Sequence, residues 1–381
     1  MNLLYINGGL SVSETFIKDL LFSLAETTSL TFLTSSNFEI NNDKVKVKNL
    51  SYNQTRSPLA NKLHFITGNK YKLKSDISYV KKRCTDFLRK NKFDVAYIEY
   101  GTTSVLFSEL LNHFNIPYVV HFHGFDASSA FSNPSYKHEI QKVFHSAASI
   151  IVPSQHLKRL LILQGGDVNK IFVVPYGINN DIIKPHGWDK RFEISPNPVL
   201  TFVGRLTPKK NPIALLYAFH TINQNFPDAE LNIVGDGPLM ADCRKKVHDL
   251  DIKNVKLWGA LPRQKVYEIL NKSWIYMQHS VTSYNGDQEG LPNSISEASA
   301  FGLPVVSTIH SGITENVLDR ETGFLVKEYD YEQMAEKAMT LLKDKDLVVR
   351  MGGKGREFIL NLCNHKKRVE QVYNLLQKAV N

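Results

Sequence analysis

The chain has 381 residues, of which 43% are hydrophobic and 22% charged, as is usual for a soluble globular protein large enough for two domains. Its three cysteines are scattered, which argues against a disulfide framework or a metal cluster and fits a reducing cytoplasm. The chain starts without a basic leader or cleavage site, and no apolar run approaches the roughly 20 residues that span a bilayer. We therefore expect a cytoplasmic protein.

The net charge of +9 favours an anionic partner. Ten Lys and Arg residues lie between Lys62 and Lys92, at positions 62, 70, 72, 74, 81, 82, 83, 89, 90 and 92. They form either a solvated helix face or a surface for anionic membranes, which would place the protein peripherally at the inner face of the cell membrane. No nucleic-acid-binding motif accompanies this charge, so we expect no nucleic-acid partner.

Short β-branched runs alternate with helical patterns along the chain. Strands are predicted at residues 3–7, 30–33, 45–50, 95–99, 118–122, 149–152 and 171–174, and again at 199–203, 231–234, 255–258, 275–278, 305–307 and 324–326. Helices are predicted between most of them, for instance at 103–114, 211–225 and 263–271. This alternation predicts α/β domains with parallel sheets covered on both faces.

A stretch rich in proline and glycine interrupts the pattern near the middle of the chain. We predict an N-terminal domain at 1–185, a linker at 186–198, a C-terminal domain at 199–362, and a C-terminal helix at 363–381 that packs back on the N-terminal domain. Both domains are expected to be doubly wound and Rossmann-like, and to face a central cleft.

Ligands of such sheets bind at the carboxyl ends of strands, and four strand ends of the second half carry glycine, charge or both. They lead into Gly204-Arg205 and then Lys210, into Gly235-Asp236-Gly237, into Gly259-Ala260-Leu261, and into a long loop that ends at Glu289. Arg205 and Lys210 suit a diphosphate, since guanidinium grips phosphate oxygens bidentately and ammonium adds a point charge. The alternative is a pair of solvated surface cations.

Residues 287–300 contain two carboxylates, Glu289 and Glu297, eight positions apart. Pro292 suits the first turn of a helix that continues to residue 301. Glu289 then precedes the helix and Glu297 lies about one turn inside it, beside the free N–H groups of the helix start. Carboxylates on both sides of an anion site are well placed to accept hydrogen bonds from the hydroxyls of a ribose–diphosphate–sugar.

In the first half, Gly8 and Gly9 follow the first strand and form either a close approach to a ligand or an ordinary turn. His121 and His123 share one side of a strand, with His123 nearer its carboxyl end. A metal site is not expected here, because no further ligands stand at suitable spacing. We interpret His121 as structural and His123, which lies beside Gly124 and near Asp126, as a polar contact to substrate.

Two Asp-x-Asp patterns, at 249–251 and 344–346, fall at predicted helix ends and are interpreted as capping residues rather than metal ligands. The chain has no G-x-S-x-G elbow and no G-x-x-x-x-G-K-[ST] loop, so serine hydrolase and P-loop NTPase functions have no support.

Taken in order, these motifs resemble one family of enzymes. A glycine-rich loop, His-Gly-x-Asp, Gly-Arg-Leu with a following Lys, and Glu-Gly-x-Pro with a second Glu resemble the retaining, nucleotide-sugar-dependent glycosyltransferases of family four, which have the GT-B architecture. The segment GLPVVSTIHSGITENVLDRETGFLV at 302–326 is similar to the family's donor domain. SETFI near the start, and Gly286-Asp287, resemble the branch that builds exopolysaccharides such as colanic acid and amylovoran.

The resemblance implies a role for each matching residue. Arg205 and Lys210 would hold the diphosphate, Glu297 the ribose hydroxyls and Glu289 the donor sugar, with His123 near the reacting carbon. The remaining donor contacts would come from Gly9, Gly204, Gly235, Leu261, Gly290, Leu291, Pro292 and Asn293. The amide of Asn293, where the family often has an apolar residue, would contact donor or acceptor.

The resemblance also implies an activity, the retaining transfer of a hexose from a nucleotide-sugar to a glycan or lipid-linked glycan in cell-surface polysaccharide biosynthesis. The donor is expected to be UDP-linked, and no metal ion or other cofactor is expected. The sequence leaves two alternatives open, a nucleotide-sugar epimerase on the same fold and a non-catalytic module that binds nucleotide-sugar or glycan.

Overall fold

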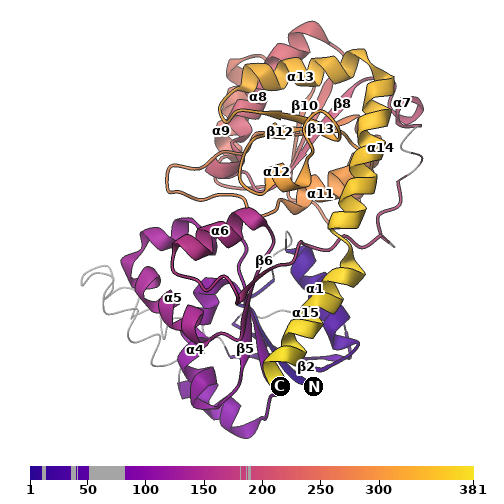
Figure 1. Ribbon diagram of the computed structural model, residues 1–381. Helices are drawn as coiled ribbons and strands as arrows, with labels where there is room; N and C mark the ends of the chain where they lie inside the picture. The colour runs from indigo at the N-terminus through magenta and orange to yellow at the C-terminus, as the bar shows by residue number, and fades with distance from the viewer. Residues whose placement is uncertain are drawn as a thin grey trace. The chain divides into compact units, whose positions relative to one another are not determined.

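The computed structural model describes residues 1–10, 14–35, 40, 42–50, 82–180, 182–185, 187 and 190–381. The chain forms two compact units (Figure 1). The first unit contains Met1–Val152, Lys158–Val174 and Val369–Asn381, and the second contains Pro153–Leu157 and Pro175–Arg368. The end of the last helix, α15 (His365–Val380), thus belongs to the first unit.

The described part of the first unit is built on a parallel sheet with strand order β3-β2-β1-β4-β5-β6-β7. Its strands are β1 (Asn2–Ile6), β2 (Ser29–Thr34), β3 (Val45–Asn49), β4 (Val95–Glu99), β5 (Tyr118–His121), β6 (Ser149–Val152) and β7 (Ile171–Val173). The labelled helices are α1 (Thr15–Ala25), α4 (Gly101–His113), η1 (Phe125–Ala127), η2 (Ser129–Ser132), α5 (Pro134–Ser146) and α6 (Gln155–Leu163), and residues 82–90 are also helical.

Apolar side chains of two helices from opposite ends of the chain cover one face of this sheet. Leu20 of α1 and Leu376 of α15 are fully buried in a single core with Leu3 and Tyr5 of β1. In Figure 1, α1 and α15 lie on one side of the sheet and α4, α5 and α6 on the other. Most of these strands are therefore buried on both faces, which explains their apolar sequences, whereas the edge strand β3 exposes Lys46 and Lys48.

The second unit contains a parallel sheet with strand order β10-β9-β8-β11-β12-β13. Its strands are β8 (Val199–Val203), β9 (Glu230–Val234), β10 (Val255–Gly259), β11 (Ile275–Gln278), β12 (Val305–Thr308) and β13 (Gly323–Val326). The helices are α7 (Arg191–Ile194), η3 (Pro208–Lys210), α8 (Pro212–Asn225), α9 (Met240–Asp249), α10 (Arg263–Lys272), α11 (Asn293–Ala300), α12 (Ile313–Asn316), α13 (Tyr331–Lys343) and α14 (Lys345–Leu362).

Both sheets have the strand order of a Rossmann fold, in which the order reverses beside the first strand. The reversal lies between β1 and β4 in the first sheet and between β8 and β11 in the second. The prediction of two doubly wound, Rossmann-like domains is confirmed, and both ends of every predicted strand lie within one residue of the observed ends. The three helices predicted by range are α4, α8 and α10.

The structure differs from expectation at two places near the site. Pro292 is not in the first turn of α11 but directly before it, with an extended ψ of 111°, because the fixed φ of proline suits both positions. Within the stretch expected to be a linker, α7 buries Arg191, which donates hydrogen bonds to the carbonyls of Ser273, Phe301 and Gly302.

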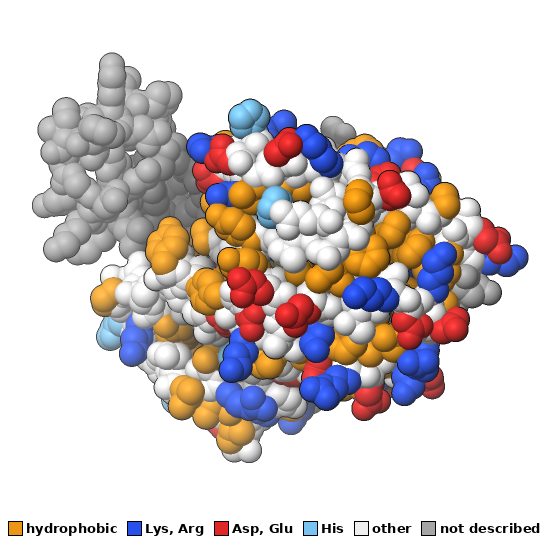
Figure 2. Space-filling view, turned by 90° about the horizontal axis from the view of Figure 1, so that it is seen from above, with side chains coloured by type: hydrophobic (Ala, Val, Ile, Leu, Met, Phe, Trp, Pro, Cys, Tyr) orange, Lys and Arg blue, Asp and Glu red, His pale blue; other side chains and the backbone are white. Residues whose placement is uncertain are grey.

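No helix among the described residues combines the length and apolar character needed to cross a membrane. On the face seen in Figure 2, basic and acidic side chains are interspersed rather than separated by sign. The two Asp-x-Asp patterns lie at helix ends as predicted. Asp344 caps α14 by accepting from Leu347 N at 2.9 Å, and Asp249, the last residue of α9, pairs with Lys245.

Candidate functional site

Two predicted site residues meet at the switch point of the second sheet. Lys210 ends η3, which follows β8, and Glu289 lies in the loop that follows β11. Lys210 Nζ lies 2.9 Å from Glu289 Oε1, and the side chains are 12% and 7% exposed. A second pair lies beside the first, since Lys209 Nζ is 3.0 Å from Asp287 Oδ1. Two adjacent lysines and two carboxylates thus join these loops.

Hydrogen bonds fix both the side chain and the backbone of Glu289. Ser280 Oγ donates to its carboxylate at 3.1 Å, and its own N–H donates to His310 Nε2 at 3.2 Å. Ser311 Oγ donates to its carbonyl oxygen. Burial alone would raise the pKa of Glu289, but the charges of Lys210 and Lys209 outweigh it and lower that pKa to about 2. Glu289 is therefore an ionised acceptor at neutral pH.

His310 was missed from the sequence although it follows the strand β12 at the same edge of the sheet. Its Nε2 accepts from Glu289, so its Nδ1 carries the proton and donates to Glu328 Oε1 at 2.6 Å. Burial lowers the pKa of His310, although Glu328 and Glu289 oppose this effect. The lowered pKa keeps the imidazole ring neutral. A histidine after a buried strand was the available signal, and its partner Glu328 could not be read from spacing.

A buried chain of hydrogen bonds leads to the carboxylate of Glu289. The Tyr276 hydroxyl lies 3.0 Å from Gln278 Oε1 and 2.9 Å from Ser294 Oγ. Gln278 Nε2 donates at 2.8 Å to Ser280 Oγ, which donates to Glu289. The start of α11 and the end of β11 are thereby coupled to Glu289, so its position depends on both elements.

Glu297 lies one turn inside α11 and has partners of its own. Tyr267 of α10 donates to Glu297 Oε1 at 3.0 Å, and Arg263 NH2 lies 3.8 Å from the same oxygen. Glu297 is only 9% exposed. The two predicted carboxylates therefore have separate partners, and Tyr267 and Arg263 were not anticipated.

Backbone packing requires the two glycines that follow β9, Gly235 and Gly237. Gly235 has φ +134°, and a Cβ there would lie 2.0 Å from the carbonyl oxygen of Gly204. A Cβ at Gly237 would meet the backbone of Leu206. These contacts fix the loop that carries Arg205, whose side chain is exposed and has no ion-pair partner among the described residues.

The segment before α11 is buried and tightly packed. Leu291 is 2% exposed, and the Pro292 carbonyl accepts from Asn316 Nδ2 at 3.1 Å. A Cβ at Gly312 would lie 1.8 Å from the carbonyl oxygen of Gly290, so these backbones touch. The Oδ1 of Asn293 is buried and, within the described part of the chain, has no hydrogen-bond partner. Such an atom is an available acceptor for a ligand donor.

In the first unit, His123 and His121 share a buried cluster with Glu99. His123 Nε2 lies 2.6 Å from Glu99 Oε2, and His121 Nδ1 lies 3.5 Å from the same oxygen and 2.8 Å from the Tyr97 hydroxyl. The expectation that the two histidines lack a third potential ligand is wrong, because β4 and β5 pair in register and bring Glu99 beside His121. Gly9 lies just beyond β1, and residues 11–13 after it are outside the described residues.

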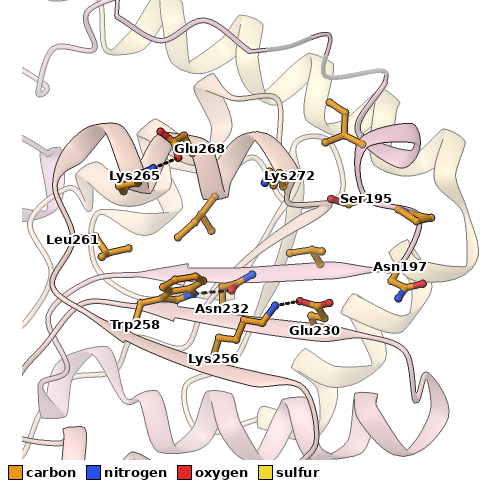
Figure 3. A pocket seen from close by; sticks show the side chains of 14 residues that line it. Ser195, Asn197, Glu230, Asn232, Lys256, Trp258, Leu261, Lys265, Glu268 and Lys272 are labelled. Carbon is orange, nitrogen blue, oxygen red and sulfur yellow. Dashed lines mark hydrogen bonds and ion pairs between the residues drawn. The ribbon is translucent and has the colours of Figure 1, made fainter.

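Leu261 is separated from the other predicted residues of the second unit. It lines a cavity of about 600 Å³ over the face of β9 and β10, beside α10 (Figure 3). There the indole N–H of Trp258 donates to Asn232 at 2.7 Å, and Lys256 pairs with Glu230. Neither Lys210 nor Glu289 lines this cavity, so the candidate site lies at the strand ends and not in the cavity.

The architecture and the site together define a class. Two Rossmann-like domains, with basic and acidic residues at a switch point, form a GT-B fold. Residues 188–358 match the family described as "Glycosyl transferases group 1", and residues 65–177 match the "Glycosyl transferase 4-like domain". The chain therefore belongs to the glycosyltransferases of this type, as its motifs predicted.

Named relatives and a solved structure agree with this assignment. The chain is 28% identical to the amylovoran biosynthesis glycosyltransferase AmsK of Erwinia amylovora, over 75% of this chain and 70% of the relative. It is 29% identical to the Escherichia coli UDP-Gal:α-D-GlcNAc-diphosphoundecaprenol α-1,3-galactosyltransferase, over 76% of each chain. The crystal structure of Anabaena HepE in complex with UDP-glucose superimposes with a TM-score of 0.80 at 17% identity, covering 99% of both chains.

Proposed function

We propose that this glycosyltransferase transfers a hexose, with retention of anomeric configuration, from a UDP-sugar to a glycan or lipid-linked glycan during exopolysaccharide biosynthesis. The relatives support this, since one is named for amylovoran biosynthesis and another for a UDP-Gal donor and a diphosphoundecaprenol-linked acceptor. The observation that carries the proposal is the buried Lys210–Glu289 pair at the switch point of the second sheet.

The cations of this site are suited to a diphosphate leaving group. As the bond from sugar to phosphate breaks, negative charge grows on the phosphate and positive charge on the sugar. Arg205 and Lys210 stabilise the phosphate, and the Glu289 carboxylate lies beside Lys210, where the sugar would sit. Because fixed cations supply this stabilisation, we expect transfer to need no metal ion.

The remaining residues contact other parts of the donor. Glu297, oriented by Tyr267, accepts hydrogen bonds from the ribose hydroxyls, and Asn293 offers its buried Oδ1 to a hydroxyl of donor or acceptor. By the family resemblance, His123 contacts the sugar near the reacting carbon. Retention follows if the acceptor attacks from the face that the diphosphate leaves, with the departing phosphate taking the acceptor's proton.

A panel of nucleotide-sugars tests the donor. A bound donor raises the melting temperature by mass action, and we expect UDP-sugars to do so in preference to GDP- or ADP-sugars. The stabilising donor is then incubated with lipid-linked glycan acceptors, and the anomeric configuration of the product is read by NMR. Conversion of the donor to an epimer without acceptor, or binding without turnover, would contradict the proposal.

Site variants test the mechanism. We expect Arg205→Ala, Lys210→Ala and Glu289→Ala each to lower kcat/KM by about 10² to 10³-fold, comparable to removal of one oxyanion-stabilising donor. The control is Lys256→Ala, which removes an exposed lysine of the same unit from its pair with Glu230 and should leave transfer unchanged. Normal turnover in all three site variants would place the reaction elsewhere.

A further inference from the structure

The cavity beside α10 lies on the face of the second sheet that is opposite to its hydrophobic core. Along β9, Leu231 and Ile233 belong to that core, so the alternating residue Asn232 lies on the other face. Trp258 of β10 lines the same cavity, which α10 closes on its far side (Figure 3). Its volume of about 600 Å³ lies within the range of about 300–1,000 Å³ that is usual for small-molecule sites.

Asn232 offers a nearly buried hydrogen-bond donor to this cavity. The residue is only 6% exposed, and its Oδ1 accepts from the indole N–H of Trp258 at 2.7 Å. Because an indole N–H can only donate, this bond fixes the amide with Oδ1 toward the ring and Nδ2 away from it, as Figure 3 shows. Within the described part of the chain, Nδ2 has no hydrogen-bond partner. It is therefore available to an oxygen atom of a ligand.

Trp258 presents a fixed aromatic surface. Its N–H is bonded to Asn232, yet the residue is 46% exposed, so the ring is held in place while much of its surface stays open. The register between β10 and β9 shifts at this position, because Leu257 and Gly259 pair with consecutive residues of β9. Trp258 is thus the extra residue of a bulge, a feature that re-aims side chains near functional sites.

The charged side chains of the lining are mostly paired with one another. Lys256 Nζ lies 2.7 Å from Glu230 Oε2, and Lys265 Nζ lies 2.8 Å from Glu268 Oε2. These four residues bound the cavity without adding net charge to it. The two carboxylates would also repel a phosphate or a nucleotide. The lining therefore favours a neutral ligand.

We propose that this cavity is a second carbohydrate site, which binds a neutral pyranose unit of a glycan away from the transfer site. A pyranose has a face of C–H groups that packs flat on an indole ring, and oxygen atoms around its edge that accept from the Asn232 amide. An acyl chain would fill the apolar part of the cavity but would leave this donor without a partner. The inference goes beyond the proposed function, since it follows from the lining and requires no transfer.

The indole N–H of Trp258 allows binding to be measured at the site itself. Its nitrogen-15 NMR resonance in the full chain is assigned by its loss in Trp258→Phe, and maltose, cellobiose, lactose and mannobiose are titrated as probes. We expect at least one disaccharide to shift this resonance in a saturable manner. Sorbitol, which has hydroxyls but no ring, should not shift it. An equal shift with sorbitol, or no saturable shift with any of the disaccharides, would overturn the proposal.

Substitutions separate stacking on the ring from filling of an apolar cavity. We expect Trp258→Leu to weaken binding of that disaccharide by about tenfold, as measured by ligand-observed NMR, and Trp258→Phe to retain most of the binding. Asn232→Leu, which has a similar shape but no donor, should also weaken it by about tenfold. Tyr284→Leu is the matched control, since Tyr284 is 91% exposed and does not line the cavity. Wild-type affinity in Trp258→Leu would contradict the proposal, and thermal melting confirms that each variant is folded.

Competition with a nucleotide separates the cavity from the donor site. This comparison is needed because Leu261, which the sequence assigns to the donor, also lines the cavity. We expect the disaccharide to shift the Trp258 resonance equally with and without excess UDP. Displacement of the disaccharide by UDP would assign the cavity to the donor and overturn the proposal. If no nucleotide-sugar binds the protein, the proposed function fails, while the disaccharide titration still decides whether the second site exists.

Discussion

Lys210 and Glu289 form a buried ion pair, and such a pair is costly to break from one side. Removing one partner leaves the other charge without compensation, typically at a cost of about 3–5 kcal/mol. Here the pair also serves the proposed reaction, because a bound diphosphate would attract Lys210 while Glu289 stays ionised. The structure thus keeps a cation at the strand ends at the expense of burying a carboxylate beside it.

We predict that Glu289→Gln lowers the free energy of unfolding by about 3 kcal/mol at pH 7. The pKa of Glu289 is about 2 in the folded chain, below its ordinary value of 4.5. A carboxyl group whose pKa is lowered by folding stabilises the folded chain at every pH above its pKa in the unfolded chain. This contribution is lost as the pH falls from about 4.5 toward 2. The difference between variant and wild type, measured by urea unfolding from pH 7 to pH 3, should therefore narrow below pH 4.5.

Asp287→Asn provides the comparison for this prediction. Asp287 pairs with Lys209 at a similar distance, but the two side chains are 19% and 20% exposed. An ion pair that is more open to solvent contributes less to stability, so we expect Asp287→Asn to lower the free energy of unfolding by about 1 kcal/mol or less. The role of burial would be contradicted if both variants lost the same free energy of unfolding. It would also be contradicted if the difference in free energy of unfolding between Glu289→Gln and the wild type stayed constant down to pH 3.

Among the elements, the turns after β8 and β9 determine where Arg205 and Lys210 lie. Their backbones touch, since Gly204 N donates to the Val234 carbonyl and Gly235 leaves room for the Gly204 carbonyl. The glycine after β9 therefore supports the loop after β8 that carries Arg205.

We predict that Gly235→Ala destabilises the fold by about 3 kcal/mol and weakens donor binding, because the new Cβ must displace the loop that carries Arg205. Gly259→Ala is its control. Gly259 also has a positive φ, +70°, but nothing lies within 4 Å of a Cβ there, so only the strain of about 1–2 kcal/mol remains. Urea unfolding and donor-induced thermal shift measure both effects, and equal behaviour of the two variants would refute the packing argument.

Strand placement was predictable because parallel strands buried on both faces appear as short apolar runs between helical patterns. The meeting of Lys210 and Glu289 also followed, since the carboxyl ends of neighbouring strands share one edge of the sheet. Partners contributed by other elements did not follow. Glu99, Tyr267 and His310 reach their partners through strand register and helix packing, and the spacing of residues in the sequence does not identify such partners.

Over the whole molecule, the distribution of charge bears on where the enzyme works. Acidic and basic side chains are mixed on the face seen in Figure 2, whereas the sequence concentrates its basic excess between Lys62 and Lys92. Residues 62–81 lie outside the described residues. Residues 82–90 are helical, with Cys84 and Leu88 buried and Lys82, Arg89 and Lys90 exposed. In the described part of the basic segment, Lys82, Arg89, Lys90 and Lys92 are therefore exposed to solvent, whereas Arg83 is half-buried.

We propose that this segment holds the protein against anionic membranes, where a lipid-linked acceptor would be found. Each basic residue near such a surface contributes about 1 kcal/mol, and salt screens the attraction. We predict that replacing Lys82, Arg89, Lys90 and Lys92 together by glutamine weakens binding to phosphatidylglycerol vesicles by on the order of 10³-fold at low salt.

Sedimentation with vesicles, from low to high salt, checks this prediction. The matched control replaces four exposed lysines of the second unit that are paired with carboxylates, Lys245, Lys253, Lys256 and Lys265. Both variants lose four positive charges, so an effect of net charge alone would weaken binding equally. A loss of vesicle binding confined to the first variant would locate the membrane contact in the basic segment. If the wild-type protein does not bind anionic vesicles at low salt, the membrane contact is excluded.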